Sequence, residues 1–422
     1  MSKPYVTILG KAVRAIAKLR GGGSALPGLV VEKIDPNFIK HALSNLPHGV
    51  VVISGTNGKT TTTKMVVKLL EDQGLKVFTN RTGSNFMRGV VAALLGEVNL
   101  LGNLKADIAV LELDEAHAVH FVKLIPPSHS LILNVMRDQL DRFGEIDTTV
   151  NLLSKIVSAT TGTVVLNRED ERIASLKKIA SKQKVKFFGL SQSILSDFPT
   201  DDKLHGGTYK SSSIVADTEL VKYSDGSATF KIDGQEITTK LKLNGMYNIY
   251  NSAAAIALVR SILGDKTDNV KLLKSLSEVT PAFGRGELVT IDGHPLELVL
   301  VKNPSGFRLG LKSFNPEGYV TMIAINDNYA DGRDMSWLWD VGFESLNATG
   351  VSLVSGTRAY DMALRLQYDG VAFSKVDTNL LRSLNEFINQ NTRSPKRIYC
   401  TYTAMLTIRR RLAKIAKMET IA

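Results

Sequence analysis

The first residues of the chain follow a helical period. Over residues 4–20 apolar side chains recur every three or four positions and basic side chains take another face, which predicts an amphipathic helix. The apolar positions are Val6, Leu9, Val13 and Ile16, and the basic positions are Lys11, Arg14 and Lys18. The next run, GGGSALPG at 21–28, indicates a flexible break. Two interpretations of the helix stay open: it packs on the rest of the protein, or it lies on a membrane surface.

From His48 onward, apolar β-branched runs alternate with helical stretches. The runs predicted as buried strands are VVVIS at 50–54, IAVLEL at 108–113, LILNV at 131–135 and TVVLN at 163–167. A helix is expected at 60–73, directly after the first of these strands. Such alternation is typical of an α/β fold, in which a mainly parallel sheet has helices on both faces.

The pattern changes again between residues 189 and 243, where a polar stretch leads into Asp-Gly turns at 225–226 and 233–234. These turns lie between alternating runs and predict β-hairpins. The segment TPAFGRGE at 280–287 reads as a hinge, and the strands and helices beyond it indicate a smaller Rossmann-like α/β domain. We therefore expect an N-terminal helix and linker (1–45), a central domain (46–290) and a C-terminal domain (291–422).

Composition narrows the classes of function. The 422 residues exceed one ordinary domain, no apolar run reaches the ~18 residues of a membrane span, and the start lacks a signal-peptide pattern. Cys400 is the sole cysteine, which excludes internal disulfides and cysteine-rich zinc sites, so we expect a cytoplasmic protein without zinc. The net charge of +11 favours polyanions such as nucleotide phosphates or anionic lipid. Nucleic acid is not an expected partner, because its recognition motifs are missing from the sequence.

The clearest chemical signal is a glycine-rich loop between the first strand and its helix. Its residues are Gly55, Thr56, Asn57, Gly58, Lys59, Thr60 and Thr61. Glycines let backbone N–H groups turn toward phosphate oxygens, and the helix N-terminus adds positive potential. In such a loop Lys59 neutralises the β- and γ-phosphates of ATP, and the Thr60 hydroxyl holds Mg²⁺. Ile53 stands where the general motif has its first glycine, so the spacing departs from that motif.

The loop sequence GTNGKTTT resembles that of Mur ligases and folylpolyglutamate synthases, which use ATP to join an amine to a carboxylate through an acyl phosphate. The resemblance implies that Glu112, in LELDEA, is the second Mg²⁺ contact and acts in catalysis with Lys59. It further implies that Asn251, in GMYNIYNSAAA, reads the adenine with support from Asn248. In FGRGE it places Arg285 toward the nucleotide. A surface carboxylate and helix-capping asparagines are the plainer alternatives.

Other motifs narrow this resemblance. In NVMRDQLDRFGE at 134–145, Gln139 replaces the histidine usual in Mur ligases, which changes that metal contact. TNRTGSNFMRG (79–89), VKNPSGF (301–307) and NDNYADGRDMSWLWD (326–340) resemble the MurT family, the ligase subunits of lipid II isoglutaminyl synthase. The resemblance implies amidation of the α-carboxylate of D-isoglutamate in the lipid II stem peptide, beside a GatD-type glutamine amidotransferase. Many MurT proteins carry a four-cysteine zinc ribbon, which this chain cannot build.

What the chain lacks also indicates a partner. A glutaminase needs a reactive thiolate, whereas Cys400 lies in the apolar run RIYC and reads as a buried structural residue. The resemblance implies that an aspartate of 326–340 orients the partner's catalytic histidine, and we expect Asp334, with Asp340 second. A contact with Arg333 or a loop cap is the alternative interpretation of Asp334.

The substrate side is less specific. Arg81, Asn85 and Arg88 are candidates for binding substrate phosphate or carboxylate, with a plain surface loop as the alternative. A peripheral position at the inner face of the membrane would bring the protein to a lipid-linked substrate. Two other functions stay open: a stand-alone ligase of the same fold that adds an amino acid, and a nucleotide-binding scaffold. The retained loop lysine and its Mg²⁺ contacts argue against the scaffold.

Overall fold

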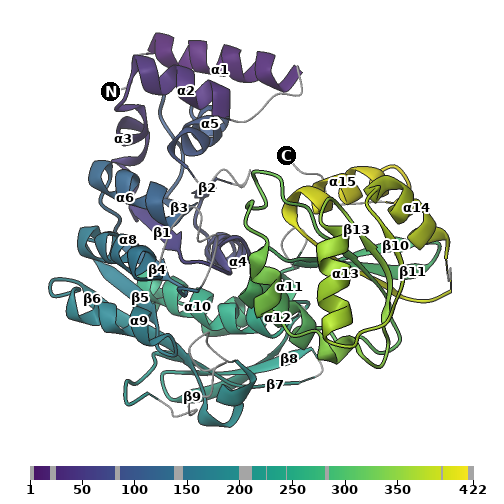
Figure 1. The fold of residues 1–422 in the computed structure, drawn as a ribbon. Helices are drawn as coiled ribbons and strands as arrows, with labels where there is room; N and C mark the ends of the chain where they lie inside the picture. The colour runs from purple at the N-terminus through teal and green to yellow at the C-terminus, as the bar shows by residue number, and fades with distance from the viewer. Residues whose placement is uncertain are drawn as a thin grey trace.

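The computed structural model places most of the chain in two sheets with their helices (Figure 1). The described ranges are 4–19, 25–80, 86–136, 146–198, 212–224, 226–243, 245–280, 285–390 and 393–416, without the side chains of Lys18 and Arg285. Within them the strands form a nine-stranded sheet, A, and a six-stranded sheet, B. This confirms the expected α/β fold, with hairpin strands that continue the first sheet and a second α/β unit.

Sheet A has the strand order β2-β3-β1-β4-β5-β6-β7-β8-β9. Its strands are β1 Val50–Ser54, β2 Val77–Thr79, β3 Ile108–Glu112, β4 His129–Ile132, β5 Thr163–Asn167, β6 Lys184–Leu190, β7 Thr218–Ser224, β8 Ser227–Ile232 and β9 Gln235–Lys240. Neighbours from β2 to β7 are parallel, and β7, β8 and β9 are antiparallel. Every residue of β1, β3 and β5 is buried, as expected for strands covered on both faces.

Helices cover both faces of sheet A, and the alternation of side chains along β1 separates the two layers. The layer that packs on Val51 and Ile53 contains α4 (Lys59–Asp72), α10 (Met246–Leu263) and α11 (Asn269–Glu278). The layer that packs on Val50 and Val52 contains α5 (Met87–Glu97), α6 (Glu115–Leu124) and α8 (Ile146–Ala159). The strand that carries the glycine loop is therefore fixed from both sides.

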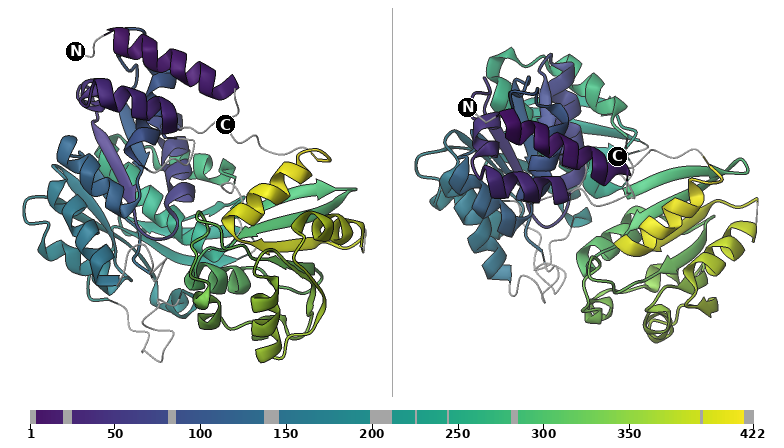
Figure 2. Two further views of the ribbon diagram at one scale, coloured as in Figure 1. Left: turned by 45° about the horizontal axis from the view of Figure 1, so that its top comes forward. Right: turned by 90° about the horizontal axis from the view of Figure 1, so that it is seen from above.

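Three helices precede sheet A, namely α1 (Pro4–Leu19), α2 (Ala25–Ile34) and α3 (Phe38–Leu43). Figures 1 and 2 show α1 and α2 as the outermost layer at this end of the molecule. The expected single helix and linker are thus corrected. Residues 25–28 form the start of α2, and Gly28 lets the α2 backbone rest directly on the Arg88 carbonyl of α5. Among the apolar positions predicted to share one face of α1, Val6 is buried, whereas Leu9 and Ile16 are 43% and 52% exposed.

Sheet B has the strand order β10-β11-β15-β12-β13-β14. Its strands are β10 Arg285–Ile291, β11 His294–Leu300, β12 Val320–Ala324, β13 Val351–Ser355, β14 Phe373–Asp377 and β15 Lys396–Cys400. Its helices are α12 Pro304–Ser313, α13 Ala359–Tyr368, α14 Leu380–Asn389 and α15 Tyr402–Leu412. The β10–β11 hairpin is antiparallel and the other pairs are parallel. Since β10 belongs to this sheet, the boundary expected at 290 falls inside a strand, and we propose a boundary before β10.

Strand β4 ends earlier than predicted, and this prepares the site. The ladder stops at Ile132 instead of residue 135, because Asn134 turns its backbone carbonyl toward the Thr56 N–H at 3.0 Å.

Shorter helical segments lie at α9 Glu171–Ser175, Leu176–Lys178, Gln192–Asp197, Gly264–Lys266, Ser336–Asp340 and Glu344–Leu346.

Candidate nucleotide-binding site

The glycine loop connects β1 to α4 and requires glycine at two positions. Gly55 and Gly58 have φ angles of 130° and 90°, which side chains disfavour. A Cβ atom on Gly55 would lie 2.9 Å from the Asn134 carbonyl oxygen, and one on Gly58 would lie 2.7 Å from Asn251 Nδ2. The loop therefore fits closely between the segment after β4 and helix α10.

Asn134 braces the loop from the side. The Asn57 N–H donates to Asn134 Oδ1 at 2.8 Å, and Asn134 Nδ2 donates back to the Asn57 carbonyl at 3.0 Å. The Met136 N–H donates to Thr56 Oγ1 at 3.1 Å, so the next residues also hold the loop. Asn134 is almost fully buried, and its paired hydrogen bonds keep the loop in shape without a ligand.

Lys59 is buried and turned back toward the loop. Its ammonium donates to the Gly55 carbonyl and lies 3.4 Å from Glu115 Oε1. Its neighbour Thr60 donates a hydrogen bond from Oγ1 to Glu112 Oε1 at 2.8 Å. Thr61 follows in the first turn of α4, where its side chain is fully buried.

The Thr60–Glu112 pair has the chemistry of a magnesium site. Hydroxyl and carboxylate oxygens are the donors that Mg²⁺ prefers, and Mg²⁺ takes few protein ligands when phosphate oxygens and waters complete its shell. Asn80 fixes Glu112, because Asn80 Nδ2 donates to the Glu112 carbonyl at 2.8 Å and the Glu112 N–H donates to Asn80 Oδ1 at 3.0 Å. Among the residues described, three or more His, Cys, Asp or Glu side chains nowhere gather as metal ligands.

A pocket opens beside the loop, on the side of α10. Its lining residues include Met136, Asn167, Asp170, Phe198, Tyr247, Tyr250 and Asn251. Asn251 lines this pocket, while Asn248 lies one turn earlier on α10, outside the lining. An aromatic wall with amide and carboxyl groups is suited to a planar, hydrogen-bonding ligand.

Asp170 closes one side of this pocket and caps α9. Its carboxylate accepts the Val135 N–H at 2.8 Å and the Ile173 N–H at 3.1 Å. Burial raises the pKa of the Asp170 carboxyl to about 6, although these N–H groups favour its charged form. Asp170 therefore fixes the segment that braces the glycine loop.

Residues 326–340 follow β12 at the carboxyl end of sheet B, and their aspartates differ in accessibility. Asp327 accepts from Arg358 Nε at 2.8 Å. Asp331 is buried and accepts the Thr403 N–H at 2.7 Å, capping α15. Asp334 and Asp340 are exposed.

Asp334 accepts the Ser336 N–H at 2.9 Å and so caps the loop at this point. Hydrogen bonding from Ser336 also lowers the pKa of the Asp334 carboxyl. The exposed group is therefore charged at neutral pH and, while capping, still presents an oxygen to the outside.

Asn303 links the two sheets. It caps α12 by accepting the Gly306 N–H at 2.7 Å, and its Nδ2 donates to Asn57 Oδ1 at 3.4 Å. The motif at 301–307 therefore touches the glycine loop.

Cys400 is fully buried and burial raises its pKa, which confirms that this thiol is structural.

Comparisons with known proteins decide the family. The Mur ligase middle domain matches residues 53–259, and the MurT ligase C-terminal domain matches residues 300–405. Lipid II isoglutaminyl synthase (glutamine-hydrolyzing) subunit MurT of Streptococcus pneumoniae R6 is 32% identical over 96% of both chains. The chain belongs to the MurT family. The Staphylococcus aureus COL protein of the same description is 31% identical over 85% of both chains.

Solved structures show the same fold at low identity. MurF from Acinetobacter baumannii has a TM-score of 0.69 and 18% identity, covering 92% of this chain and 81% of its own. MurF from Thermotoga maritima in complex with ADP has a TM-score of 0.66 and 18% identity, covering 90% and 84%. The MurT chain thus shares the Mur ligase fold.

None of the helices in its described ranges is both long and apolar enough to cross a membrane.

Four polar residues at the MurT site were not predicted from the sequence. They are Asn80, Glu115, Asn134 and Asn303. Each lies inside one of the sequence motifs described above. The pattern that could have found them is a polar residue at or just beyond the end of a strand.

Arg81, Asn85, Gln139 and the side chain of Arg285 lie outside the described residues. Arg88 forms a surface ion pair with Glu32 at 2.7 Å.

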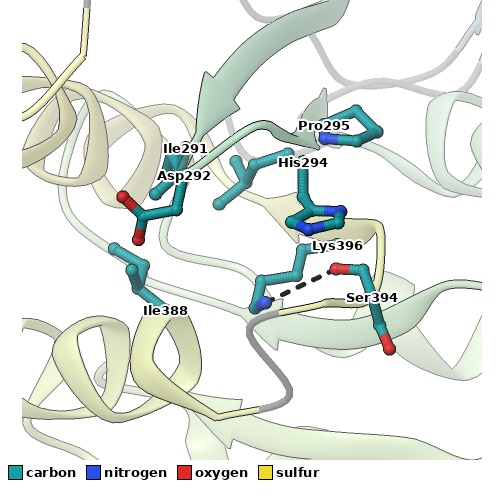
Figure 3. A pocket seen from close by; sticks show the side chains of 8 residues that line it. Ile291, Asp292, His294, Pro295, Ile388, Ser394 and Lys396 are labelled. Carbon is teal, nitrogen blue, oxygen red and sulfur yellow. Dashed lines mark hydrogen bonds between the residues drawn. The ribbon is translucent and has the colours of Figure 1, made fainter.

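A second pocket in this MurT chain lies away from these motifs (Figure 3). It is lined by Asp292, His294 and Lys396, whose ammonium donates to the Ser394 carbonyl at 3.5 Å. Because β15 begins at Lys396, the pocket lies at the amino ends of the parallel strands. Ligands of open α/β sheets bind outside the carboxyl ends, where residues 326–340 lie. This pocket is therefore not part of the candidate site.

Proposed function

We propose that this protein is the ligase subunit that amidates the α-carboxylate of D-isoglutamate in the lipid II stem peptide. It uses ATP, and a GatD-type glutaminase subunit supplies ammonia. The observation that carries the proposal is likeness to the pneumococcal MurT subunit over 96% of both chains, joined to a formed glycine loop with its Thr60–Glu112 oxygen pair.

The nucleotide binds along the loop and α10. Phosphate oxygens meet the N–H groups of residues 55–60 and the N-terminus of α4, and adenine enters the pocket beside Asn251. Arg285 stays a proposed nucleotide contact, with Asn248 in a supporting place. Thr60 and Glu112 would hold Mg²⁺, which when bound neutralises negative charge on the phosphates.

The chemistry begins with a poor electrophile, because a carboxylate has no good leaving group. Its oxygen attacks the γ-phosphorus of ATP, ADP leaves, and an acyl phosphate forms. Ammonia then attacks the acyl carbon, phosphate leaves with the acyl C–O bond electrons, and a proton is lost to give the amide. Lys59 offsets the charge that builds on the transferring phosphoryl group.

Ammonia must come from another chain, since the only thiol, Cys400, is buried and protonated. We propose that Asp334 orients the catalytic histidine of the glutaminase. Exposed aromatic and apolar side chains lie on the segment that carries Asp334 and on α13, as expected for an interface. They are Tyr329, Trp339, Tyr360, Leu364 and Tyr368, each at least 49% exposed.

Reconstitution with the glutaminase, ATP, Mg²⁺ and lipid II tests the proposal, with amidated product measured by mass spectrometry. We expect product with glutamine only when the partner is present, and product with ammonium without it. ATP hydrolysis driven by an amino acid but not by ammonia would instead indicate the stand-alone amino-acid ligase.

We propose that the reaction takes place at the cytoplasmic face of the membrane, where ATP meets a lipid-linked substrate.

A further inference from the structure

The outer face of α1 is apolar and open to solvent. It consists of Tyr5, Ile8, Leu9, Ile16 and Leu19, spaced by three, one, seven and three positions, with alanine side chains between them. Ile8 and Ile16 are each 52% exposed, and Leu19 is 88% exposed. Such a continuous stripe on a helix normally faces a protein core, so its outward position indicates a binding surface.

The opposite face of α1 fixes this orientation. Val6, Thr7 and Gly10 are buried, and a Cβ atom on Gly10 would lie 2.6 Å from Val31 of α2 and 2.7 Å from Leu95 of α5. Only a residue without a side chain fits there. The helix therefore cannot rotate to bury its larger apolar side chains without losing this contact.

Two cations of α1 lie on the side of the helix that faces α5. Lys11 donates from Nζ to the Leu95 carbonyl at 2.9 Å, and the Arg14 guanidinium lies against Gly96, so both are held beside α5. Lys33 of α2 is exposed next to Ile34, which is 40% exposed. An apolar stripe with cations nearby complements anionic lipid, where apolar side chains enter the interface and cations meet phosphates.

We propose that the outer face of α1 binds the surface of an anionic lipid bilayer, with the helix lying in the interface. The helix has 16 residues and does not span, in keeping with the lack of a membrane-crossing helix in the described ranges. The purpose of this contact rests on the proposed function, since the lipid-linked substrate lies in that surface. The contact itself needs neither ATP nor substrate.

Flotation of the full-length protein with vesicles tests the proposal. Vesicles of phosphatidylglycerol and phosphatidylcholine are compared with vesicles of phosphatidylcholine alone, over a range of salt concentrations. We expect binding to the anionic vesicles that weakens with salt. The variant Ile8→Ser/Ile16→Ser should lower the partition coefficient about thirtyfold, because two apolar side chains no longer enter the lipid.

The matched control is Ile179→Ser/Leu381→Ser, which changes two similarly exposed side chains, 44% and 48%, elsewhere on the surface. This control should bind vesicles like the natural protein. Equal binding of Ile8→Ser/Ile16→Ser, or no binding by the natural protein, would overturn the proposal. A dimer in sedimentation velocity that this variant converts to monomer, without vesicle binding, would assign the face to self-association and also overturn it.

Amidation of a water-soluble muropeptide by the same variant separates this proposal from the proposed function. Full activity on the soluble substrate with lost vesicle binding supports both. Vesicle binding by the natural protein without amidation of any substrate would contradict the proposed function and leave the lipid contact standing.

Discussion

The carboxyl ends of the two sheets carry charged residues in opposite states. At sheet A, Lys59, Glu112 and Glu115 are buried and hydrogen-bonded within the chain. On the segment that follows β12 of sheet B, Asp334 and Asp340 are exposed, as are the aromatic side chains of Tyr329 and Trp339. Buried charges must be matched internally, whereas exposed ones can be completed by another molecule. The comparison teaches that sheet A holds a site of its own and that sheet B contributes to a site shared with a partner.

The largest expected effect comes from Asp334→Asn. Glutamine-driven amidation should fall about ten-thousandfold if Asp334 holds the partner's histidine, by analogy with an aspartate lost from a hydrolase triad. Ammonium-driven amidation should not change, because the ATP site is untouched. Product formation is measured with each nitrogen source in the reconstituted complex.

Asp340→Asn tests the second candidate, which is exposed on the same segment. It should leave both reactions near their natural rates. Equal losses with glutamine and with ammonium in Asp334→Asn would contradict a role at the shared site.

Lys59→Ala probes the other side of the comparison. Amidation should fall about a thousandfold with either nitrogen source, because a positioned charge on the phosphoryl group is lost. The variant also leaves Glu115 buried without its cation, which should lower the melting temperature. Combining it with Glu115→Gln should restore the melting temperature but not the activity. Full amidation by Lys59→Ala would revive the scaffold hypothesis.

Asp170 predicts a pH dependence of stability. Its folded pKa of about 6 lies above the usual 3.8, so between these values the folded protein binds a proton that the unfolded chain has released. The contribution of this group to the free energy of unfolding therefore falls as pH rises from about 4 to 6, by about 3 kcal/mol in total, and is level above.

The change is measured as the difference in unfolding free energy between the natural protein and Asp170→Asn, from urea titrations across this pH range. Other titrating groups cancel in the difference. A difference that stays constant with pH would contradict the raised pKa.

The smallest effect concerns the link between the sheets. Asn303→Ala and Asn379→Ala each remove a helix N-cap, of α12 and α14, and should each cost about 1 kcal/mol of stability. Only Asn303 also reaches Asn57 in the glycine loop. Asn303→Ala alone should therefore raise the KM for ATP, by a few-fold. An equal rise in Asn379→Ala would show that the effect is a general loss of stability.

The fold was predictable where strands are fully apolar. β1, β3 and β5 are buried throughout, so continuous apolar runs marked them. β6 and β14 were not predicted, because both begin with exposed or half-exposed residues and carry lysines that interrupt the run. For α1 the period predicted the helix, but of its apolar positions Val6 is buried while Leu9 and Ile16 face outward. Periodicity separates two faces and does not say which one the rest of the chain covers.

The candidate site was predictable where its residues are consecutive. The order of the glycine loop defines its chemistry, and a strand-end carboxylate such as Glu112 meets it by the geometry of parallel strands. Asn134 and Asn80 were missed because their hydrogen-bonding partners lie 77 and 32 residues away. Such contacts depend on how strands are ordered in the sheet, which the sequence pattern does not specify.

The contacts of Lys59 have a consequence for turnover. Its ammonium already contacts the Gly55 carbonyl and the Glu115 carboxylate. When a triphosphate binds, the ammonium therefore exchanges these oxygen partners for phosphate oxygens. The contribution of Lys59 to the free energy of nucleotide binding is thus the difference between two strong interactions, and it is smaller than either. When the nucleotide leaves, these internal contacts are again available to the Lys59 ammonium.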